Sequence, residues 1–159
     1  MMELNKISKR KEFNQFSKEY YYELEVDGKL LEDFINEQNP EIKKGLVPTL
    51  LNWLSDESER KVVWKRVLPK IGEKEKLPIL MCSEDIDFWC TLIIVEVETD
   101  ENYIYWNRFG LEDSDTTNPE EIAENVNWFE NVNKMKFRRE NYLKVLNEFK
   151  LRLNEEIAY

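Results

Sequence analysis

The stretch from residue 77 to residue 109 constrains the fold more than any other part of the chain, because it holds three strand-like segments in a row. These segments are Leu77–Cys82, Phe88–Glu98 and Tyr103–Phe109, and short acidic turns join them. Phe88–Glu98 begins apolar on both faces and ends by alternating valine with glutamate, which is typical of a strand that leaves a buried centre for a half-exposed end. Consecutive strands joined by short polar turns predict an antiparallel meander.

Helical patterns lie on both sides of this meander. The apolar residues from Leu30 to Ile35 fall on one helix face, and Asn39-Pro40 ends that helix. Asn118–Glu121 has the composition of a helix start, with Asn as the cap and Pro at the first helical position. Near the C-terminal end, four apolar residues recur at the spacing of a helix of about four turns. They are Tyr142, Leu146, Phe149 and Leu153.

Three shorter segments complete the prediction of the fold. Glu19–Val26 is rich in aromatic residues and precedes the turn signal Asp27-Gly28, which predicts a strand. Gly45–Leu54 is consistent with a short helix after its proline, and the alternating segment Lys61–Leu68 predicts a strand. We therefore expect one α+β domain over residues 1–159, with helices packed on an antiparallel sheet and a long C-terminal helix.

The composition excludes several classes of enzyme. A chain without histidine cannot use Ser-His-Asp or Cys-His chemistry or bind zinc through histidine, and its 4 glycines form no phosphate-binding loop. Carboxylate chemistry stays open as an alternative; we expect no catalytic residue and no cofactor. The longest uninterrupted aliphatic run is Leu92–Val95, and neither a targeting segment nor a membrane span is predicted. We expect a cytoplasmic protein.

The negative charge of the chain is concentrated in one block. The whole chain has a formal net charge of −10, and residues 84–130 contain 14 acids against a single base, Arg108, which is a net charge of −13. Such a block repels nucleic acid, because phosphate contacts need lysine and arginine, and it attracts a basic partner. The alternative interpretation is a solvated acidic face that keeps the protein soluble.

Six acids of this block flank the meander, and they are the candidate binding residues. Three follow its first strand and three follow its last strand, so they would form one acidic patch if both groups reach the same sheet edge. Neither group matches the calcium-binding loop pattern. Trp106 shares its predicted face with Arg108 and is the candidate aromatic anchor, whereas Trp89 is expected in the core. The six acids are Glu84, Asp85, Asp87, Glu112, Asp113 and Asp115.

Cys82 and Cys90 bracket the first acidic turn, near the facing ends of two predicted strands. They could be buried reduced thiols, a disulfide or redox pair, or metal ligands. A cytoplasmic compartment argues against the disulfide, and a structural zinc site would need carboxylates to complete its ligands in a chain without histidine. We expect reduced buried thiols and no metal.

The segments YYELEVDGKLLEDF at residues 21–34 and LPILMCSEDIDFWCTLIIVEVETDENYIYWNRFG at residues 77–110 suggest a family. They resemble bacterial immunity proteins, the antidotes encoded beside polymorphic or contact-dependent growth-inhibition toxins. The resemblance implies a non-enzymatic function, namely tight stoichiometric binding of one cognate toxin with a basic surface, often a nuclease. The alternatives are a small carboxylate-dependent enzyme and a general cytosolic protein-interaction module. No nucleic-acid or membrane partner is expected.

Overall fold

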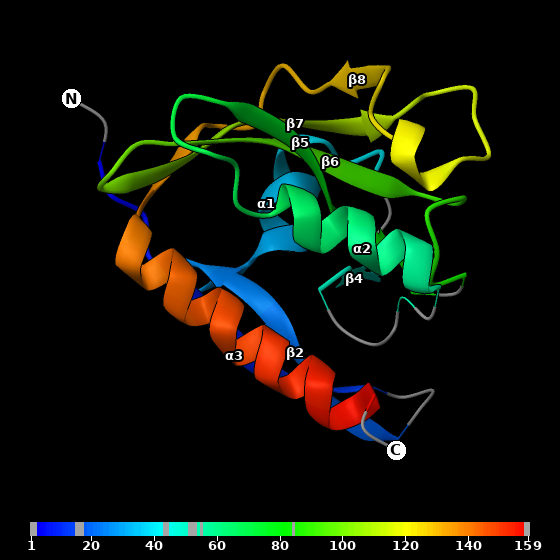
Figure 1. Ribbon diagram of the computed structural model, residues 1–159, viewed down its shortest axis with the longest axis horizontal. Coiled ribbons are helices and arrows are strands. Elements are labelled where there is room, and N and C mark those ends of the chain that lie inside the picture. Colours follow the sequence, from blue (N-terminus) through cyan, green and yellow to red (C-terminus); the bar gives the residue numbers. More distant parts are fainter. Residues whose placement is uncertain are drawn as a thin grey trace.

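The computed structural model describes residues 3–14, 18–42, 45–50, 54, 56–83 and 85–157 (Figure 1). Its smaller sheet contains β1 (Ile7–Asn14), β2 (Glu19–Val26) and β3 (Lys29–Leu30), in that order. Its larger sheet has the order β4 (Leu46–Pro48), β5 (Lys74–Cys82), β6 (Leu92–Thr99), β7 (Tyr103–Glu112) and β8 (Val126–Trp128), and β9 (Met135–Arg138) also pairs with β7. The helices are α1 (Leu31–Gln38), α2 (Glu57–Arg66), the 3₁₀ turn η1 (Pro119–Glu121) and α3 (Arg139–Ile157).

The meander β5–β6–β7 is antiparallel, as the sequence predicts. Leu77 pairs with Val95, and Val95 pairs in turn with Phe109, so the three strands share one buried centre. The α+β prediction is therefore confirmed, including the long C-terminal helix.

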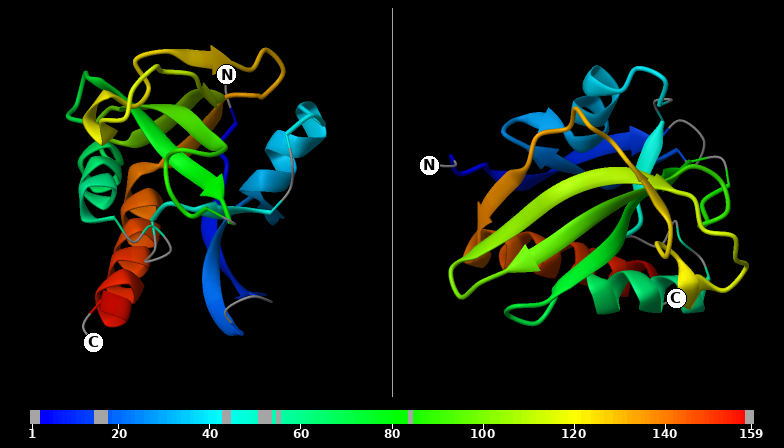
Figure 2. Two further views of the ribbon diagram at one scale, coloured as in Figure 1. Left: turned by 90° about the vertical axis from the view of Figure 1, so that its right-hand side faces the viewer. Right: turned by 90° about the horizontal axis from the view of Figure 1, so that it is seen from above.

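Helix α3 joins the two sheets through its apolar face. The four residues that predict this helix, Tyr142, Leu146, Phe149 and Leu153, are all buried. Its N-terminal half packs against β7 and β9 (Figure 2), and side chains of its C-terminal half contact β1 and β2. Among the described residues, no helix combines the length and the apolar character that crossing a bilayer requires.

The predicted strand Lys61–Leu68 is wrong, because residues 57–66 form helix α2. The carboxylate of Asp56 accepts a hydrogen bond of 3.1 Å from the backbone N–H of Glu59 and so caps the helix. Glutamates lie in the first turn and basic residues in the last, where each complements the helix dipole. Glu59, Val62, Val63 and Val67 are buried, which is the helical spacing rather than the alternation of a strand.

Three other boundaries also differ from the prediction. Leu46–Pro48 is strand β4, which the sequence does not predict, and residues 51–53 of the short helix predicted after Pro48 lie outside the described residues. Residues 88–91 form turns before β6 begins at Leu92. The helix predicted from Asn118 is the single 3₁₀ turn η1, and the Asn118 side chain caps it as expected by accepting a hydrogen bond from the N–H of Glu120.

Candidate interaction surface

Two acid-rich loops lie at the same end of the larger sheet. One is the β5–β6 loop, described at residue 83 and residues 85–91, and the other is the β7–β8 loop, residues 113–125. Met81 pairs with Leu92, and Ile93 pairs with Leu111, so the C-terminal ends of β5 and β7 both flank the start of β6. Both loops lie at the right of Figure 1. We call these two loops, together with Glu112 at the end of β7, the acidic end of the sheet.

The candidate acids in the β5–β6 loop differ in their surroundings. Glu84 lies outside the described residues. Asp85 is exposed, whereas Asp87 is half-buried and its carboxylate accepts a hydrogen bond of 2.9 Å from the backbone N–H of Trp89. Asp85 can therefore meet a partner directly, while Asp87 also shapes the loop.

The candidate acids at the end of β7 and in the loop after it also differ in their surroundings. The carboxylate of Glu112 accepts hydrogen bonds from the backbone N–H groups of Ser114, at 2.6 Å, and Ala123, at 2.5 Å. Glu112 therefore closes its own loop instead of facing solvent freely. Asp113 and Asp115 are exposed on that loop. The structure brings the described acids of both groups to one end of the sheet, which is the condition for a single acidic patch. The sequence does not separate the loop-forming acids from the exposed ones.

The predicted aromatic anchor is wrong, because Trp106 is only 1% exposed. The ladder between β6 and β7 shifts at this point: Glu96 pairs with Arg108 and Val97 pairs with Trp106, which leaves Asn107 as an extra residue. Such a bulge puts residues i and i+2 on opposite faces. Trp106 therefore points into the core, whereas Arg108 points outward, with its guanidinium 3.9 Å from the ring centre of Trp128 and 3.0 Å from the Glu96 carboxylate.

Trp89, which the sequence places in the core, is instead the exposed tryptophan of the acidic end. Trp89 is 45% exposed and lies in the β5–β6 loop between Asp87 and Cys90. The loop folds this way because the neighbouring Phe88 takes the core position and is buried. Tryptophan is among the residues enriched at protein interfaces, so Trp89 takes the place of Trp106 as the aromatic candidate of this surface.

The β5–β6 loop is fastened to the body of the protein. The backbone N–H of Phe88 donates a hydrogen bond of 2.7 Å to the buried carboxylate of Glu59 on α2. Burial raises the pKa of Glu59, the nearby charges of Asp56 and Asp87 raise it further, and the hydrogen bond from Phe88 opposes them. Ile86 has a φ of +47°, a left-handed conformation that is unusual for a β-branched residue. These contacts fix the backbone of the loop next to Trp89.

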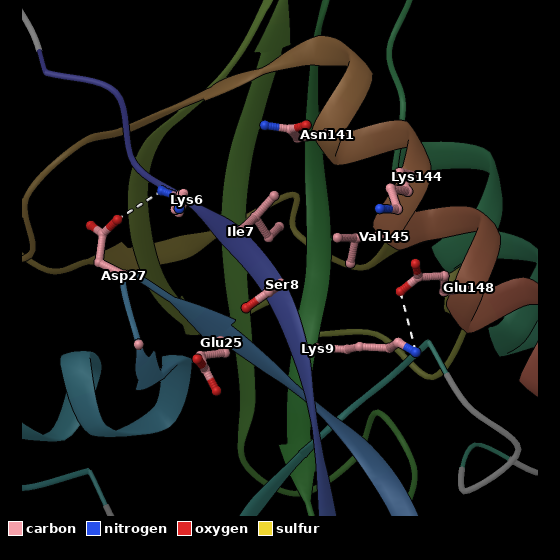
Figure 3. Close-up of a pocket in the computed structure, with 11 residues that line it drawn as sticks. Lys6, Ile7, Ser8, Lys9, Glu25, Asp27, Asn141, Lys144, Val145 and Glu148 are labelled. Atoms are coloured by element: carbon pink, nitrogen blue, oxygen red, sulfur yellow. Dashed lines mark hydrogen bonds and ion pairs between the residues drawn. The ribbon is translucent and has the colours of Figure 1, made fainter.

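A cavity of about 550 Å³ lies elsewhere, between β1, the β2–β3 turn and the first half of α3 (Figure 3). An ion pair and a hydrogen bond to the backbone join residues of its lining. The Lys9 ammonium lies 3.4 Å from the Glu148 carboxylate, and the Asp27 carboxylate accepts a hydrogen bond of 2.7 Å from the backbone N–H of Lys6. The cavity belongs to the smaller sheet and α3, so it is separate from the acidic end.

Glu23 on β2 is a buried acid that the sequence does not single out. It is 2% exposed, and one carboxylate oxygen accepts a hydrogen bond of 3.0 Å from the Tyr21 hydroxyl. The other oxygen has no hydrogen-bond partner in the part of the chain that the structure describes. Burial, followed by the charge of Glu32, raises the pKa of Glu23 to about 8. A carboxylate-dependent enzyme would place such a group in a cavity, and Glu23 does not line the cavity of Figure 3.

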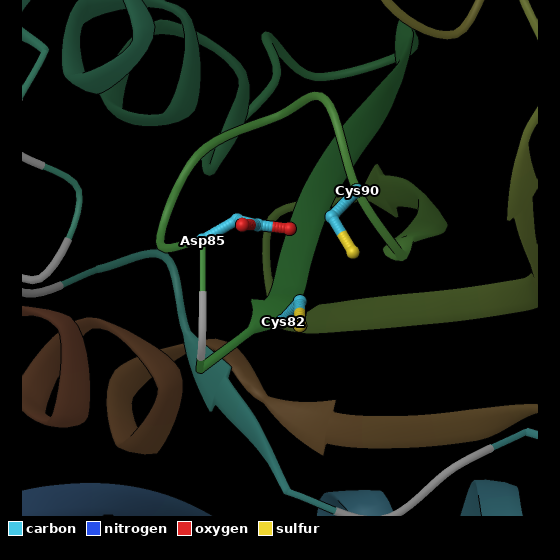
Figure 4. Close-up of side chains that lie close together, drawn as sticks. All are labelled: Cys82, Asp85 and Cys90. Atoms are coloured by element: carbon cyan, nitrogen blue, oxygen red, sulfur yellow. The ribbon is translucent and has the colours of Figure 1, made fainter. Parts of the chain in front are cut away.

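The two cysteines are not the buried pair that the sequence predicts. Cys82 ends β5 and is half-buried, Cys90 is exposed, and both thiols are free. The carboxylate of Asp85 lies beside them (Figure 4). A hydrogen bond with Asp85 is the main cause of the raised pKa of the Cys90 thiol, and the neighbouring Cys82 adds to it.

Comparisons with known proteins add no relative to this description. No protein-family model, no curated protein sequence and no solved structure matches the chain. The function proposed below therefore rests on the residues and contacts above and on the resemblance of the sequence.

Proposed function

We propose that this chain is an immunity protein that acts in the cytoplasm and neutralises a cognate bacterial toxin by tight stoichiometric binding. The toxin would have a basic surface, as a nuclease does. One observation carries the proposal: Trp89 is exposed on a fastened loop at the same sheet end as the exposed acids Asp85, Asp113 and Asp115. The resemblance of the sequence to immunity proteins supplies the biological class.

Charge supports the proposal through the rate of association. The exposed acids of the two loops create a negative field that would steer a cationic partner toward this end of the sheet. Steering of this kind raises association above the usual ~10⁵–10⁶ M⁻¹s⁻¹. Arg108 on the neighbouring strand is paired with Glu96. Arg66 and Lys76 donate to backbone carbonyls of the β7–β8 loop and Lys65 pairs with Glu120, so these bases offset part of the field and leave the exposed Asp85, Asp113 and Asp115 as its main sources.

Trp89 supports the proposal through the lifetime of the complex. Exposed tryptophans at the centre of an interface are typical hot spots, because they bury a large area at a small entropic cost. The neighbouring acids would form the polar rim around this contact. Basic residues of the partner would then determine the association rate, and the tryptophan would determine the dissociation rate.

The function is tested by co-expressing the chain with the protein encoded beside it. We expect the pair to co-purify in a 1:1 complex, and we expect the chain to restore growth that the neighbour inhibits. A binding module of general use would co-purify with a neighbour that is not toxic. Absence of both rescue and co-purification would refute the proposed function.

Charge reversal at the acidic end tests the electrostatic part. The double variant Asp113→Lys/Asp115→Lys should slow association with the partner by about 10-fold or more, because it removes steering charge, and should reduce the salt dependence of the rate. The matched control is Glu73→Lys/Glu101→Lys, which changes the net charge equally but lies at the opposite end of the sheet, where both acids are exposed. Surface plasmon resonance at low and high salt would measure both, and equal effects of the two variants would contradict local steering.

Substitution of Trp89 tests the anchor. Trp89→Ala should weaken the complex by at least about 2 kcal/mol, roughly 30-fold, with most of the change in the dissociation rate. Trp89→Phe keeps an aromatic ring at the same position and should retain part of the affinity. Unchanged dissociation of the alanine variant would show that the partner binds elsewhere.

A further inference from the structure

We propose that Cys82, Asp85 and Cys90 form a binding site for Zn²⁺. One donor atom from each residue, the two Sγ atoms and a carboxylate oxygen, lies within 4.8 Å of the other two. Figure 4 shows the three side chains directed toward one common space, Cys82 from the end of β5 and the other two from the β5–β6 loop. The inference concerns the chain alone and does not rest on the proposed function.

The distances fit a zinc ion with little movement. Tetrahedral zinc, with Zn–S bonds of about 2.3 Å and Zn–O bonds of about 2.1 Å, holds its donor atoms about 3.6–3.8 Å apart. The observed separations of up to 4.8 Å therefore need to shrink by little more than about 1 Å. Asp85 and Cys90 are exposed, so rotation of their side chains can supply this change without disturbing the core.

Backbone contacts hold the ligand residues in this arrangement. The N–H of Cys82 donates to the carbonyl of Thr91 at 3.1 Å, which joins the two cysteine-bearing ends of the loop. The N–H of Ile86 donates to the carbonyl of Cys82 at 3.0 Å and folds Asp85 back over the strand end. Since the loop is closed before an ion arrives, metal binding does not have to supply the entropic cost of ordering it.

The donor set favours zinc over other common ions. Thiolates are poor ligands for Mg²⁺ and Ca²⁺, which take oxygen donors, and a carboxylate adds little for Cu⁺, which prefers sulfur alone. Zn²⁺ accepts both thiolate and carboxylate. The Asp87 carboxylate already accepts a hydrogen bond from the N–H of Trp89. Among the described residues, the donor atoms that come together at the proposed site are those of Cys82, Asp85 and Cys90. These three donors leave one position of a tetrahedral zinc ion for a further ligand, and water can fill it.

The test is a titration of the reduced full-length protein with Co²⁺, a spectroscopic substitute for Zn²⁺. We expect saturation at one ion per chain, a thiolate-to-cobalt charge-transfer band and the visible bands of tetrahedral Co²⁺, all lost when Zn²⁺ is added. Cys82→Ser and Cys90→Ser should each weaken the charge-transfer band and lower the affinity at least about 10-fold. Asp85→Asn should lower the affinity similarly but keep the band at saturation. Loss of a residue that only hydrogen-bonds to a metal ligand already lowers metal affinity about 10–100-fold, so loss of a ligand itself should cost no less.

The matched control is Asp87→Asn, which removes the same charge from the same loop, keeps a side-chain oxygen that can accept the hydrogen bond from the Trp89 N–H, and leaves the three proposed ligands intact. It should bind Co²⁺ as the unmodified chain does. Circular dichroism would verify that each variant is folded, and the exposure of Asp85 and Cys90 favours this. A titration without a charge-transfer band, or with bands that survive both cysteine substitutions, would overturn the zinc site. Purified protein whose thiols are joined in a disulfide, and which binds no Co²⁺ after reduction, would overturn it as well.

Discussion

Replacing Trp106 by alanine is expected to lower the free energy of unfolding by about 3–5 kcal/mol. The indole is 1% exposed, and its ring centre lies 5.0 Å from that of Phe137, 5.8 Å from that of Phe109 and 6.1 Å from that of Tyr142. The substitution removes a large buried side chain from the place where β7, β9 and α3 meet, and the surrounding rings cannot close the resulting cavity. A loss of this size is a large fraction of the stability of an ordinary domain. Urea unfolding followed by circular dichroism would measure it.

The matched control is Trp89→Ala, which removes the same side chain from an exposed position. We expect this variant to lose about 1 kcal/mol or less, because the Trp89 residue is 45% exposed, while Phe88 takes the buried position of the loop. The two variants should thus separate stability from binding: Trp106→Ala destabilises the fold, and Trp89→Ala weakens the proposed complex. Equal losses of stability would contradict the assignment of the two tryptophans.

The sequence predicts an exposed Trp106 and a buried Trp89, and the structure shows the reverse. This difference shows why the strands of a sheet can be predicted from the sequence when the face on which each side chain lies cannot. The alternation of a strand assigns each residue to a face only while the ladder stays in register. One extra residue, Asn107, shifts that register and turns Trp106 inward. No glycine or proline marks the bulge in the segment YIYWNRF, so nothing local in the sequence indicates it.

Long periodic patterns and chain topology were predictable, whereas surroundings created by distant segments were not. Helix α3 repeats its apolar spacing over several turns, and the meander fixes which loops share a sheet end. Helix α2 was missed, although Asp56 and Glu59 have the spacing of a capping signal. The approach of Asp85 to Cys90 depends on the turn at Ile86, whose positive φ the sequence does not reveal.

Glu23 is the clearest case of surroundings that the sequence hides. Tyr21, Glu23 and Glu25 alternate along β2 as the residues of a solvent-facing side do. In the structure, α1 and β4 both pack against β2, and Glu23 is buried. Burial by segments that come later in the chain therefore converts an ordinary strand glutamate into a group with a strongly shifted pKa.

Glu23→Gln is expected to stabilise the protein at neutral and alkaline pH. The pKa of Glu23 is raised from 4.5 to about 8 in the folded state, so between these pH values the folded chain binds a proton that the unfolded chain has lost. The free energy of unfolding of the unmodified protein should therefore fall as the pH rises through this window, by up to about 1.4 kcal/mol per pH unit. The contribution is fully present below pH 4.5 and is lost as the pH passes about 8.

Glutamine cannot ionise, can accept the same hydrogen bond from the Tyr21 hydroxyl and should remove this dependence. The variant should match the unmodified protein near pH 4 and exceed it by several kcal/mol, at most about 5 kcal/mol, near pH 9. Glu41→Gln, at an exposed position, removes the same charge and should leave the pH profile unchanged. Urea unfolding between pH 4 and pH 9 would compare the three proteins. A glutamine variant that is less stable at every pH would mean that Glu23 is ionised in the fold and that its charge stabilises the smaller sheet.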